Sequence, residues 1–256
     1  MSDFKSRLDP NNVLKANGGD GNGRVTQNKI LLSLPGKEFS SVFPALELQE
    51  LPTHVILNEM SEPIEFAYFI ESGLASVLNV MQDGKSVEVG LTGSEGFVGI
   101  PLLVGFNSSP SRVVMQIEGS AFKISAKNLA AVLSTCPKLE RSLLRFSQEL
   151  AVQAAQVAAC NRLHEVDERL ARWLLMSQDR VGGDIIRLTQ EFLAHMLGTR
   201  RASVTVAAGM LQKAGLIKYS RGEVIIVNRK ELEDASCECY GAIKRQSQSW
   251  QNEAKK

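Results

Sequence analysis

One segment near the C-terminus, residues 188–219, restricts the possible folds more than any other part of the chain. It reads LTQEFLAHMLGTRRASVTVAAGMLQKAGLIKY. Thr189 can cap a first helix that runs to Leu197, and Thr199 can cap a second helix. Gly198 between them suits the left-handed backbone of a sharp turn. The spacing of three residues is typical of a helix-turn-helix: small Ala194, Gly198 four positions later, and Val204 six positions after the glycine.

The residues that follow predict a wing. Residues 216–219, 220–222 and 223–227 have the patterns of a strand, a tight turn and a second strand. Across 187–230, eight basic residues stand against two acidic ones, whereas the net charge of the whole chain is only +1. A local excess of positive charge is what contact with DNA phosphates requires. We therefore expect a DNA-binding winged helix-turn-helix; the alternative is a charged, solvated face on a purely structural one.

The first half of the chain has the pattern of a small β domain. Asp83-Gly84 is a hairpin turn signal. Short strands with regular spacing indicate a barrel or roll rather than βαβ units, although the pattern alone also fits another small β domain. Before it, ILLSLP and SSVFPAL predict short helical pieces. The expected strands are 53–58, 66–72, 74–80, 86–91, 112–119 and 121–125.

A helix of about 25 residues without glycine is expected to begin at Pro137. Small Ala155, Ala158 and Ala159 would allow another helix to approach closely. Because one β domain offers little surface to cover so long an apolar seam, we expect a second copy of the helix as its partner. The alternative is a helix packed along its own domain. The apolar residues of the seam, at steps of four or three, are Leu139, Leu143, Phe146, Leu150, Ala154 and Val157.

Composition excludes several classes of protein. Of the 256 residues, 44% are hydrophobic and 22% are charged, as in ordinary globular proteins. No run of about 18 apolar residues could span a membrane, and the N-terminus does not resemble a signal peptide. Four cysteines are too few for a secreted disulfide scaffold, so we expect a cytoplasmic protein. No Gly-rich phosphate loop, metal-spaced His/Asp set or G-x-S-x-G motif occurs, so no enzyme is predicted.

These features together resemble a known family. FIESG at 69–73, the long helix, and LTQEFLAHMLGTRRASVTVAAGML followed by a wing are similar to the CRP–FNR superfamily of bacterial transcription regulators. The resemblance covers about residues 28–230. It implies an α+β fold with a cyclic-nucleotide-binding-like β-roll, a dimerisation helix and a C-terminal winged helix-turn-helix. The expected divisions are a disordered tail at 1–27, a sensor at 28–136, the dimerisation helix at 137–164, and the DNA-binding domain with a C-terminal helix at 165–256.

The resemblance also implies partners and contact residues. A dimer of this kind acts on palindromic double-stranded DNA, with RNA polymerase as a further partner. Arg201 stands where the family's recognition helix commonly has an arginine, and a guanidinium can bind O6 and N7 of guanine together. Ala202 and Val206 replace a glutamate and an arginine of cyclic-AMP-responsive members, so another DNA sequence preference is expected. The other implied contact residues are Thr189, Gln190, Thr199, Arg200, Ser203, Thr205, Lys213 and Arg221.

The expected effector pocket departs from the family's cyclic-nucleotide cassette, which is Gly-Glu, a short helix, then Arg-Ser/Thr. Gly99 is followed by Ile100 instead of glutamate, and Arg112 is followed by Val113. A cyclic nucleotide would leave its ribose hydroxyl without a partner, at roughly 1–3 kcal/mol per unpaired group. Cyclic AMP is therefore not expected, and a different effector in the same cavity stays open.

Iron–sulfur sensing, the family's other well-known mode, requires clustered thiolates, usually four. No cysteine precedes Cys136, and Cys237 and Cys239 together with Cys160 are too few, with no histidine nearby for zinc. We expect ordinary thiols on a C-terminal helix from Lys230 to about Gln246, with a redox role as the minor alternative. No metal or cofactor is predicted, and the histidines are expected to be structural; they are His54, His164 and His195.

The leading hypothesis is a dimeric, sequence-specific transcription regulator. The competing hypothesis is a cyclic-nucleotide-fold ligand-binding module whose winged unit mediates protein contacts. A phosphate-contacting dimer loses affinity for duplex DNA steeply as salt rises, and a module for protein contacts does not.

Overall fold

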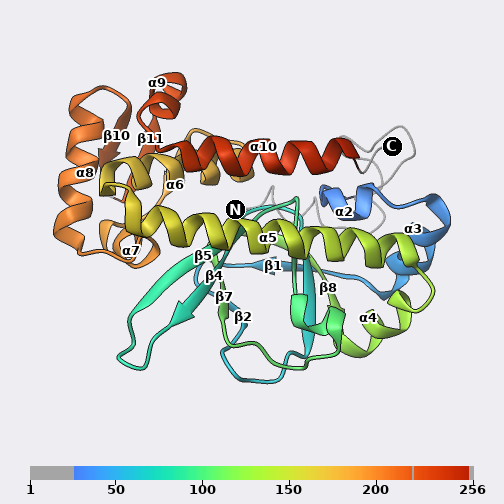
Figure 1. Ribbon diagram of the computed structural model, residues 1–256. Helices are drawn as coiled ribbons and strands as arrows, with labels where there is room; N and C mark the ends of the chain where they lie inside the picture. Colours follow the sequence, from blue (N-terminus) through green and yellow to red (C-terminus); the bar gives the residue numbers. More distant parts are fainter. Residues whose placement is uncertain (1–25, 221, 254–256) are drawn as a thin grey trace, which may run out of the picture.

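The structure is a computed structural model, and it describes residues 26–220 and 222–253. Figure 1 shows a β-roll on one side of the long helix α5 (Pro137–Leu163), with a compact helical unit and wing at one end. The tail predicted for residues 1–27 lies outside the described residues except for its last two. Thr26 is buried, and its Oγ1 donates a hydrogen bond to Glu71 Oε1 at 2.5 Å, so ordered structure begins earlier than expected.

Short helices precede the β-roll, as the sequence predicts. Asn28 caps α2 (Lys29–Leu32) by accepting hydrogen bonds from the amides of the first turn. Its Nδ2 donates to the carbonyls of Ile70 and Gly96, which fixes α2 to the roll. The helices α3 (Gly36–Val42) and η2 (Phe43–Ala45) follow.

Two four-stranded antiparallel sheets form the roll, with the orders β1-β8-β3-β6 and β2-β7-β4-β5. An apolar core that includes Ile70, Met115 and Val113 lies inside the roll. The Asp83-Gly84 turn joins β4 to β5, and the Met81 amide donates to the Lys85 carbonyl at 2.7 Å. The strands are β1 (Glu47–Leu51), β2 (Ile56–Asn58), β3 (Phe66–Ile70), β4 (Leu74–Val80), β5 (Ser86–Thr92), β6 (Phe97–Val98), β7 (Arg112–Ile117) and β8 (Gly119–Ser125).

The inner face of α5 packs on its own chain. After η3 (Ile100–Val104) and α4 (Ala126–Leu133), α5 places Leu139, Leu143 and Phe146 in a buried cluster with Phe69 and Phe97 of the roll. The expectation that these three residues need a second copy of the helix is therefore wrong, because the chain's own sheet covers them. The alternative, a helix packed along its own domain, describes this part of the seam.

The rest of the seam is also covered within the chain. Leu150 packs on β5, where a Cβ at Gly90 would lie only 2.7 Å from Leu150 Cδ1. Val157 is buried, and Ala154 is half-buried. The solvent-facing side of α5 instead carries a different set of residues, which includes Leu144, Gln148, Ala151, Ala155, Ala158 and Arg162.

The C-terminal unit is a helical core with a three-stranded sheet of order β10-β11-β9. Glu165 and Glu168 form a capping box at the start of α6. The predicted single C-terminal helix is two helices, since the chain turns between Ala235 and Cys237. The elements are α6 (Val166–Val181), β9 (Ile185–Arg187), α7 (Gln190–Met196), α8 (Arg201–Lys213), β10 (Ile217–Ser220), β11 (Glu223–Ile226), α9 (Arg229–Asp234) and α10 (Glu238–Glu253).

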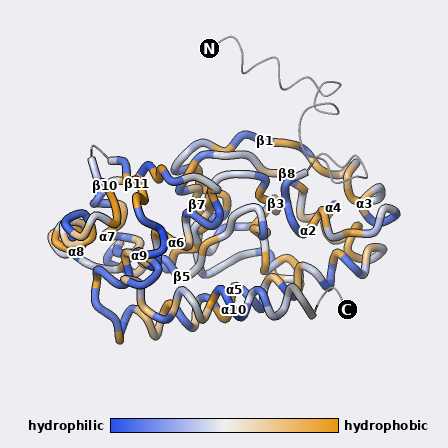
Figure 2. Tube along the Cα trace, turned by 90° about the horizontal axis from the view of Figure 1, so that it is seen from above, coloured by the Kyte–Doolittle hydropathy of each residue, from blue (hydrophilic) through white to orange (hydrophobic). Residues whose placement is uncertain are grey.

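Helix α10 runs back along α5 toward the sensor. Figure 1 shows the two helices side by side, and in Figure 2, seen from above, they overlap along one edge of the molecule. Ser247 Oγ donates to Glu149 Oε2 at 3.0 Å between them. No helix within the described ranges is long and apolar enough to cross a membrane.

Candidate nucleic-acid interface and sensor pocket

Helices α7 and α8 form the predicted helix-turn-helix. Thr189 Oγ1 accepts a hydrogen bond from the Phe192 amide at 3.2 Å and caps α7 as expected. Gly198 adopts a φ of +56° in the turn. The prediction that Thr199 caps α8 is wrong: its amide donates to the Ala194 carbonyl at 2.9 Å, which keeps Thr199 in the turn. The N-cap is Arg200, without a side-chain cap.

Packing between the two helices leaves one face of α8 open. Val204 and Leu211 are buried against Leu193 of α7 and Trp173 of α6. The opposite face exposes Arg201, Thr205, Val206, Met210 and Lys213, with Val206 and Met210 exposed to 64% and 53%. Exposed apolar side chains between basic ones suit a DNA groove, where they can contact a thymine methyl group.

Four polar side chains meet at the start of α8. Thr205 Oγ1 donates to Gln190 Oε1 at 2.7 Å, and Arg201 Nη1 lies 3.8 Å from Glu191 Oε2. Both members of the Arg201–Glu191 pair are about two-thirds exposed, so water screens the pair and its contribution is small. The guanidinium of Arg201 therefore stays free to exchange this partner for another acceptor. Ser203 is half-buried beside them.

Not every basic residue of this unit is available to DNA. Arg187 pairs with Glu223 at 3.0 Å across the wing sheet, and Arg229 pairs with Asp179 at 2.6 Å inside the unit. Arg221, an expected DNA contact, lies outside the described residues. Within 187–230, the exposed cations that pair with no carboxylate among the residues placed by the structure are Arg200, Lys213, Lys218 and Lys230.

In the sensor, the expected phosphate arginine already has a partner. Arg112 Nε donates to both oxygens of Glu59 at 3.0 Å, and its Nη2 lies 2.9 Å from Glu59 Oε2. The hydrogen bond from Arg112 holds the pKa of Glu59 below its usual value. An incoming phosphate would have to compete with this carboxylate.

The remaining predicted pocket residues offer no polar side chain. Gly99 has a φ of +121°, and a Cβ there would lie 2.7 Å from Ala67 Cβ. Ile100 packs against the Phe69–Phe97 cluster, whereas Val113 belongs to the core inside the roll. The structure therefore separates Ile100 and Val113 into two apolar clusters instead of joining all four predicted residues around one polar cavity.

Comparison with known families agrees with this architecture. Residues 48–136 match the family model of the cyclic nucleotide-binding domain, and residues 168–235 match that of the Crp-like helix-turn-helix domain. The chain belongs to the CRP/FNR family of transcriptional regulators. Its family is therefore one of regulators and not of enzymes, and none of the curated proteins matches its sequence.

Solved structures of CRP/FNR regulators share the fold at low sequence identity. A crp/fnr family regulator from Eubacterium rectale has 16% identity and a TM-score of 0.63, over 82% of this chain and 98% of its own. The regulator CLP of Xanthomonas campestris, described as responsive to c-di-GMP, has 18% identity and a TM-score of 0.63, over 75% and 99%. FixK2 from Bradyrhizobium japonicum has 16% identity and a TM-score of 0.61, over 75% and 98%.

The DNA-binding unit of this CRP/FNR protein is in close contact with its own sensor. Arg180 of α6 donates to Glu95 Oε1 at 2.8 Å and to Gln153 Oε1 at 3.0 Å. Near the helix-turn-helix, Gln116 Nε2 of β7 lies 3.1 Å from Met196 Sδ of α7. These contacts connect the sensor and α5 to α6 and α7, on which α8 packs.

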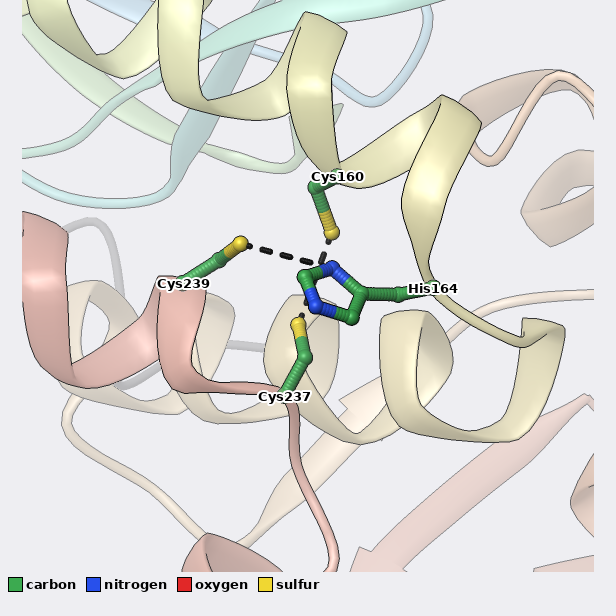
Figure 3. A group of neighbouring side chains, drawn as sticks. All are labelled: Cys160, His164, Cys237 and Cys239. Carbon is green, nitrogen blue, oxygen red and sulfur yellow. Dashed lines mark hydrogen bonds between the residues drawn. The ribbon is translucent and has the colours of Figure 1, made fainter.

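One group of functional side chains was not predicted. Cys160, His164, Cys237 and Cys239 come together where α5 ends and α10 begins (Figure 3). The expectation of no histidine near these cysteines is wrong, because the fold places His164 Nδ1 3.6 Å from Cys239 Sγ. A sequence signal exists: His164 stands only four residues after Cys160, at the C-cap of α5, so the two side chains lie near the same helix end.

The electrostatics of this group favour a thiolate. A hydrogen bond from Cys237, assisted by the charge of Arg172, lowers the pKa of Cys160 to about 4, against the effect of burial. The same hydrogen bond, together with burial, raises the pKa of Cys237. Cysteines expected to be ordinary thiols on one helix thus form a buried, interacting set.

Proposed function

We propose that the protein is a homodimeric transcription regulator that binds palindromic double-stranded DNA sequence-specifically through α8 and the wing. The observation that carries the proposal is the open face of α8, where Arg201 lies among exposed residues that no part of 26–220 or 222–253 covers. RNA polymerase is the expected further partner and the cytoplasm the expected location.

Arg201 is proposed to read a base, because an exposed guanidinium at the start of a recognition helix can bind guanine bidentately. The hydrogen bond from Thr205 to Gln190 holds the two helices in fixed register beside it, which supports a role for both in positioning. Exposed Arg200 and Lys213 fit phosphate contacts. Thr189, Thr199, Ser203 and Arg221 complete the proposed interface.

We propose that the dimer forms through the outer face of α5 rather than its inner seam. This face carries six exposed residues at alternating steps of four and three: Leu144, Gln148, Ala151, Ala155, Ala158 and Arg162. This spacing is the one that keeps a stripe facing a partner helix. Small alanines in its centre allow close approach.

Cyclic AMP and cyclic GMP are proposed not to be the effectors. The ion pair between Arg112 and Glu59 and the apolar side chain of Ile100 support this, since neither the phosphate nor the ribose would find a free partner. A different small molecule remains compatible with the sensor.

Selection of bound sequences from a random DNA pool tests the proposal. The expected result is enrichment of a palindrome, and affinity for that site should fall steeply as salt rises because bound counterions are released. Absence of any enriched sequence, together with salt-independent or undetectable duplex binding, would favour the competing module whose winged unit contacts proteins.

A further inference from the structure

Four potential ligands converge between two distant parts of the chain. Cys160 lies in the last turn of α5 and His164 directly follows this helix, whereas Cys237 directly precedes α10 and Cys239 lies in its first turn. Their ligand atoms all lie within 4.8 Å of one another, and the three cysteines are at most 3% exposed. Figure 3 shows the three thiols directed toward the imidazole of His164.

The spacing of these atoms fits one small ion. Bonds of about 2.3 Å to sulfur and about 2.05 Å to nitrogen at tetrahedral angles give edges of about 3.8 Å between sulfurs and about 3.6 Å between sulfur and nitrogen. The structure has 3.5 Å between Cys160 Sγ and Cys237 Sγ, and 3.6 Å between Cys239 Sγ and His164 Nδ1. A multi-iron cluster binds its cysteines through different iron atoms and needs wider separations.

We propose that Cys160, His164, Cys237 and Cys239 form a tetrahedral site for one divalent metal ion of the zinc type. Three thiolates and one imidazole are a closed ligand set that leaves no open position, as in structural rather than catalytic zinc sites. Soft sulfur ligands in tetrahedral geometry select zinc over magnesium or calcium, which prefer oxygen.

Groups around the four ligands are arranged as such a site requires. His164 Nε2 lies 2.9 Å from Glu238 Oε2, so this nitrogen can donate its proton to the carboxylate and leave the lone pair of Nδ1 for the ion. Gln156 Nε2 donates a hydrogen bond to Cys239 Sγ at 3.0 Å. Such a hydrogen bond is stronger when the sulfur is a thiolate than when it is a thiol. Glu238 thus orients the imidazole from its outer nitrogen, and Gln156 contacts a ligand sulfur directly.

Two buried arginines supply the charge that the site needs. A doubly charged cation with three thiolates leaves one net negative charge. Arg169 and Arg172 are 7% and 2% exposed and form no ion pair with any carboxylate in the described part of the chain. The Nε atoms of both also lack a hydrogen-bond partner. Arg172 interacts electrostatically with Cys160, and Arg169 with Cys160 and Cys237. Among carboxyl groups, Glu88 interacts electrostatically with Arg172 and Glu165 with Arg169, and a metal–thiolate centre would add to the negative charge that faces these two arginines.

The position of the site gives it a structural consequence. It joins the end of α5 to the start of α10, at the point where the chain passes from the sensor helix to the DNA-binding unit. Bound metal would hold α10 against α5 and restrict movement of the helix-turn-helix relative to the sensor. Because the ligands are brought together only by the fold, binding of the ion and folding of this junction are coupled.

Elemental analysis of the full-length protein tests the proposal. Protein expressed in zinc-supplemented medium and dialysed under reducing conditions should retain about one zinc per chain. Cys237→Ser and Cys239→Ser should each retain less than about a tenth of that amount. Cys136→Ser is the matched control, since Cys136 is also a buried free cysteine but lies in the sensor core, and it should keep the full amount.

A second measurement tests the site without the cysteine variants, which could lose metal simply because they fail to fold. Wild-type protein stripped by a chelator and titrated with cobalt(II) should develop the intense visible absorption of tetrahedral thiolate coordination, saturating at one equivalent. Glu238→Gln, which keeps all four ligands, should bind zinc about 10–100-fold more weakly with an unchanged circular dichroism spectrum. Wild-type protein without stoichiometric metal, iron with acid-labile sulfide, or a Cys160–Cys237 disulfide under reducing conditions would each overturn the proposal.

Discussion

Trp173 Nε1 donates a hydrogen bond to Glu88 Oε1 at 2.9 Å, which joins α6 of the DNA-binding unit to strand β5 of the sensor. Ser76 Oγ donates to the other oxygen of the same carboxyl group at 2.5 Å. Both side chains are buried, with Trp173 only 1% exposed. A buried ionisable group between two domains makes their packing sensitive to pH.

Stability is expected to fall as pH rises through the titration of Glu88. Burial raises the pKa of Glu88 to about 7, although hydrogen bonds from Ser76 and Trp173 and the charges of Arg172 and Arg180 oppose the shift. Because the pKa of Glu88 is 4.5 in the unfolded state, the folded state binds the proton more tightly. The stabilisation that comes from this proton is fully present below about pH 4.5 and lost by about pH 7. The free energy of unfolding is expected to decrease by roughly 3 kcal/mol over this pH range.

Glu88→Gln measures that contribution, because glutamine stays neutral at every pH. Free energies of unfolding in urea should diverge between variant and wild type as pH rises from about 5 to about 8, in favour of the variant. Parallel pH profiles for the two proteins would show that Glu88 does not titrate in this range.

Arg201→Ala should remove base readout without removing general affinity. The variant should lose roughly 1–3 kcal/mol of binding free energy on the selected site, and its base preference should relax at one position of each half-site. Its affinity for random duplex should change little. Lys213→Ala is the control, since a phosphate contact should weaken both duplexes alike. Fluorescence anisotropy titrations with both DNAs measure the difference. Equal losses on the two duplexes for Arg201→Ala would contradict base readout.

Local sequence patterns predict much of the fold. The helix-turn-helix depends on residues within 25 positions of one another, so its turn at Gly198 and its buried Val204 can be read from spacing. Strand β1, with sequence ELQEL, was not predicted because polar residues dominate it and its pairing with β8 makes it a strand. The two-residue β6 likewise exists only through its pairing with β3.

Contacts between distant segments could not be predicted in the same way. The apolar seam of α5 specifies a stripe to be buried, but the same stripe fits a second copy or the chain's own sheet. Leu143 and Phe146 turn out to face the sheet. Cys160 and Cys237 are 77 positions apart, and their proximity depends on the return of α10 along α5.

Ala155→Glu should convert the dimer to a monomer. Ala155 lies on the exposed face of α5, where a glutamate from each subunit would bring like charges together in the proposed interface. Sedimentation at micromolar concentration should show a dimer for the wild type and a monomer for the variant, with weaker DNA binding. Leu150→Glu is less informative, because Leu150 packs on β5 and its substitution would disturb the fold itself.

Ala131→Glu provides the control for this experiment. Ala131 is an exposed alanine on α4, so it tests the same chemical change away from the proposed interface. It should remain a dimer. A wild-type protein that sediments as a monomer, or an Ala155→Glu variant that remains a dimer, would rule out the outer face of α5 as the interface.

Cyclic AMP and cyclic GMP should produce no binding signal in isothermal titration with the wild-type protein. Arg112 makes a two-oxygen contact with Glu59, and a cyclic phosphate would have to displace that carboxylate. The ribose hydroxyl would meet Ile100, which cannot accept its hydrogen bond, at a cost of roughly 1–3 kcal/mol. Glu59→Gln should leave Arg112 with a neutral neighbour and permit at most weak binding that does not distinguish the two nucleotides, because Ile100 is unchanged. Micromolar affinity of the wild type for either nucleotide, accompanied by a change in DNA affinity, would show that the sensor binds cyclic nucleotides by other contacts.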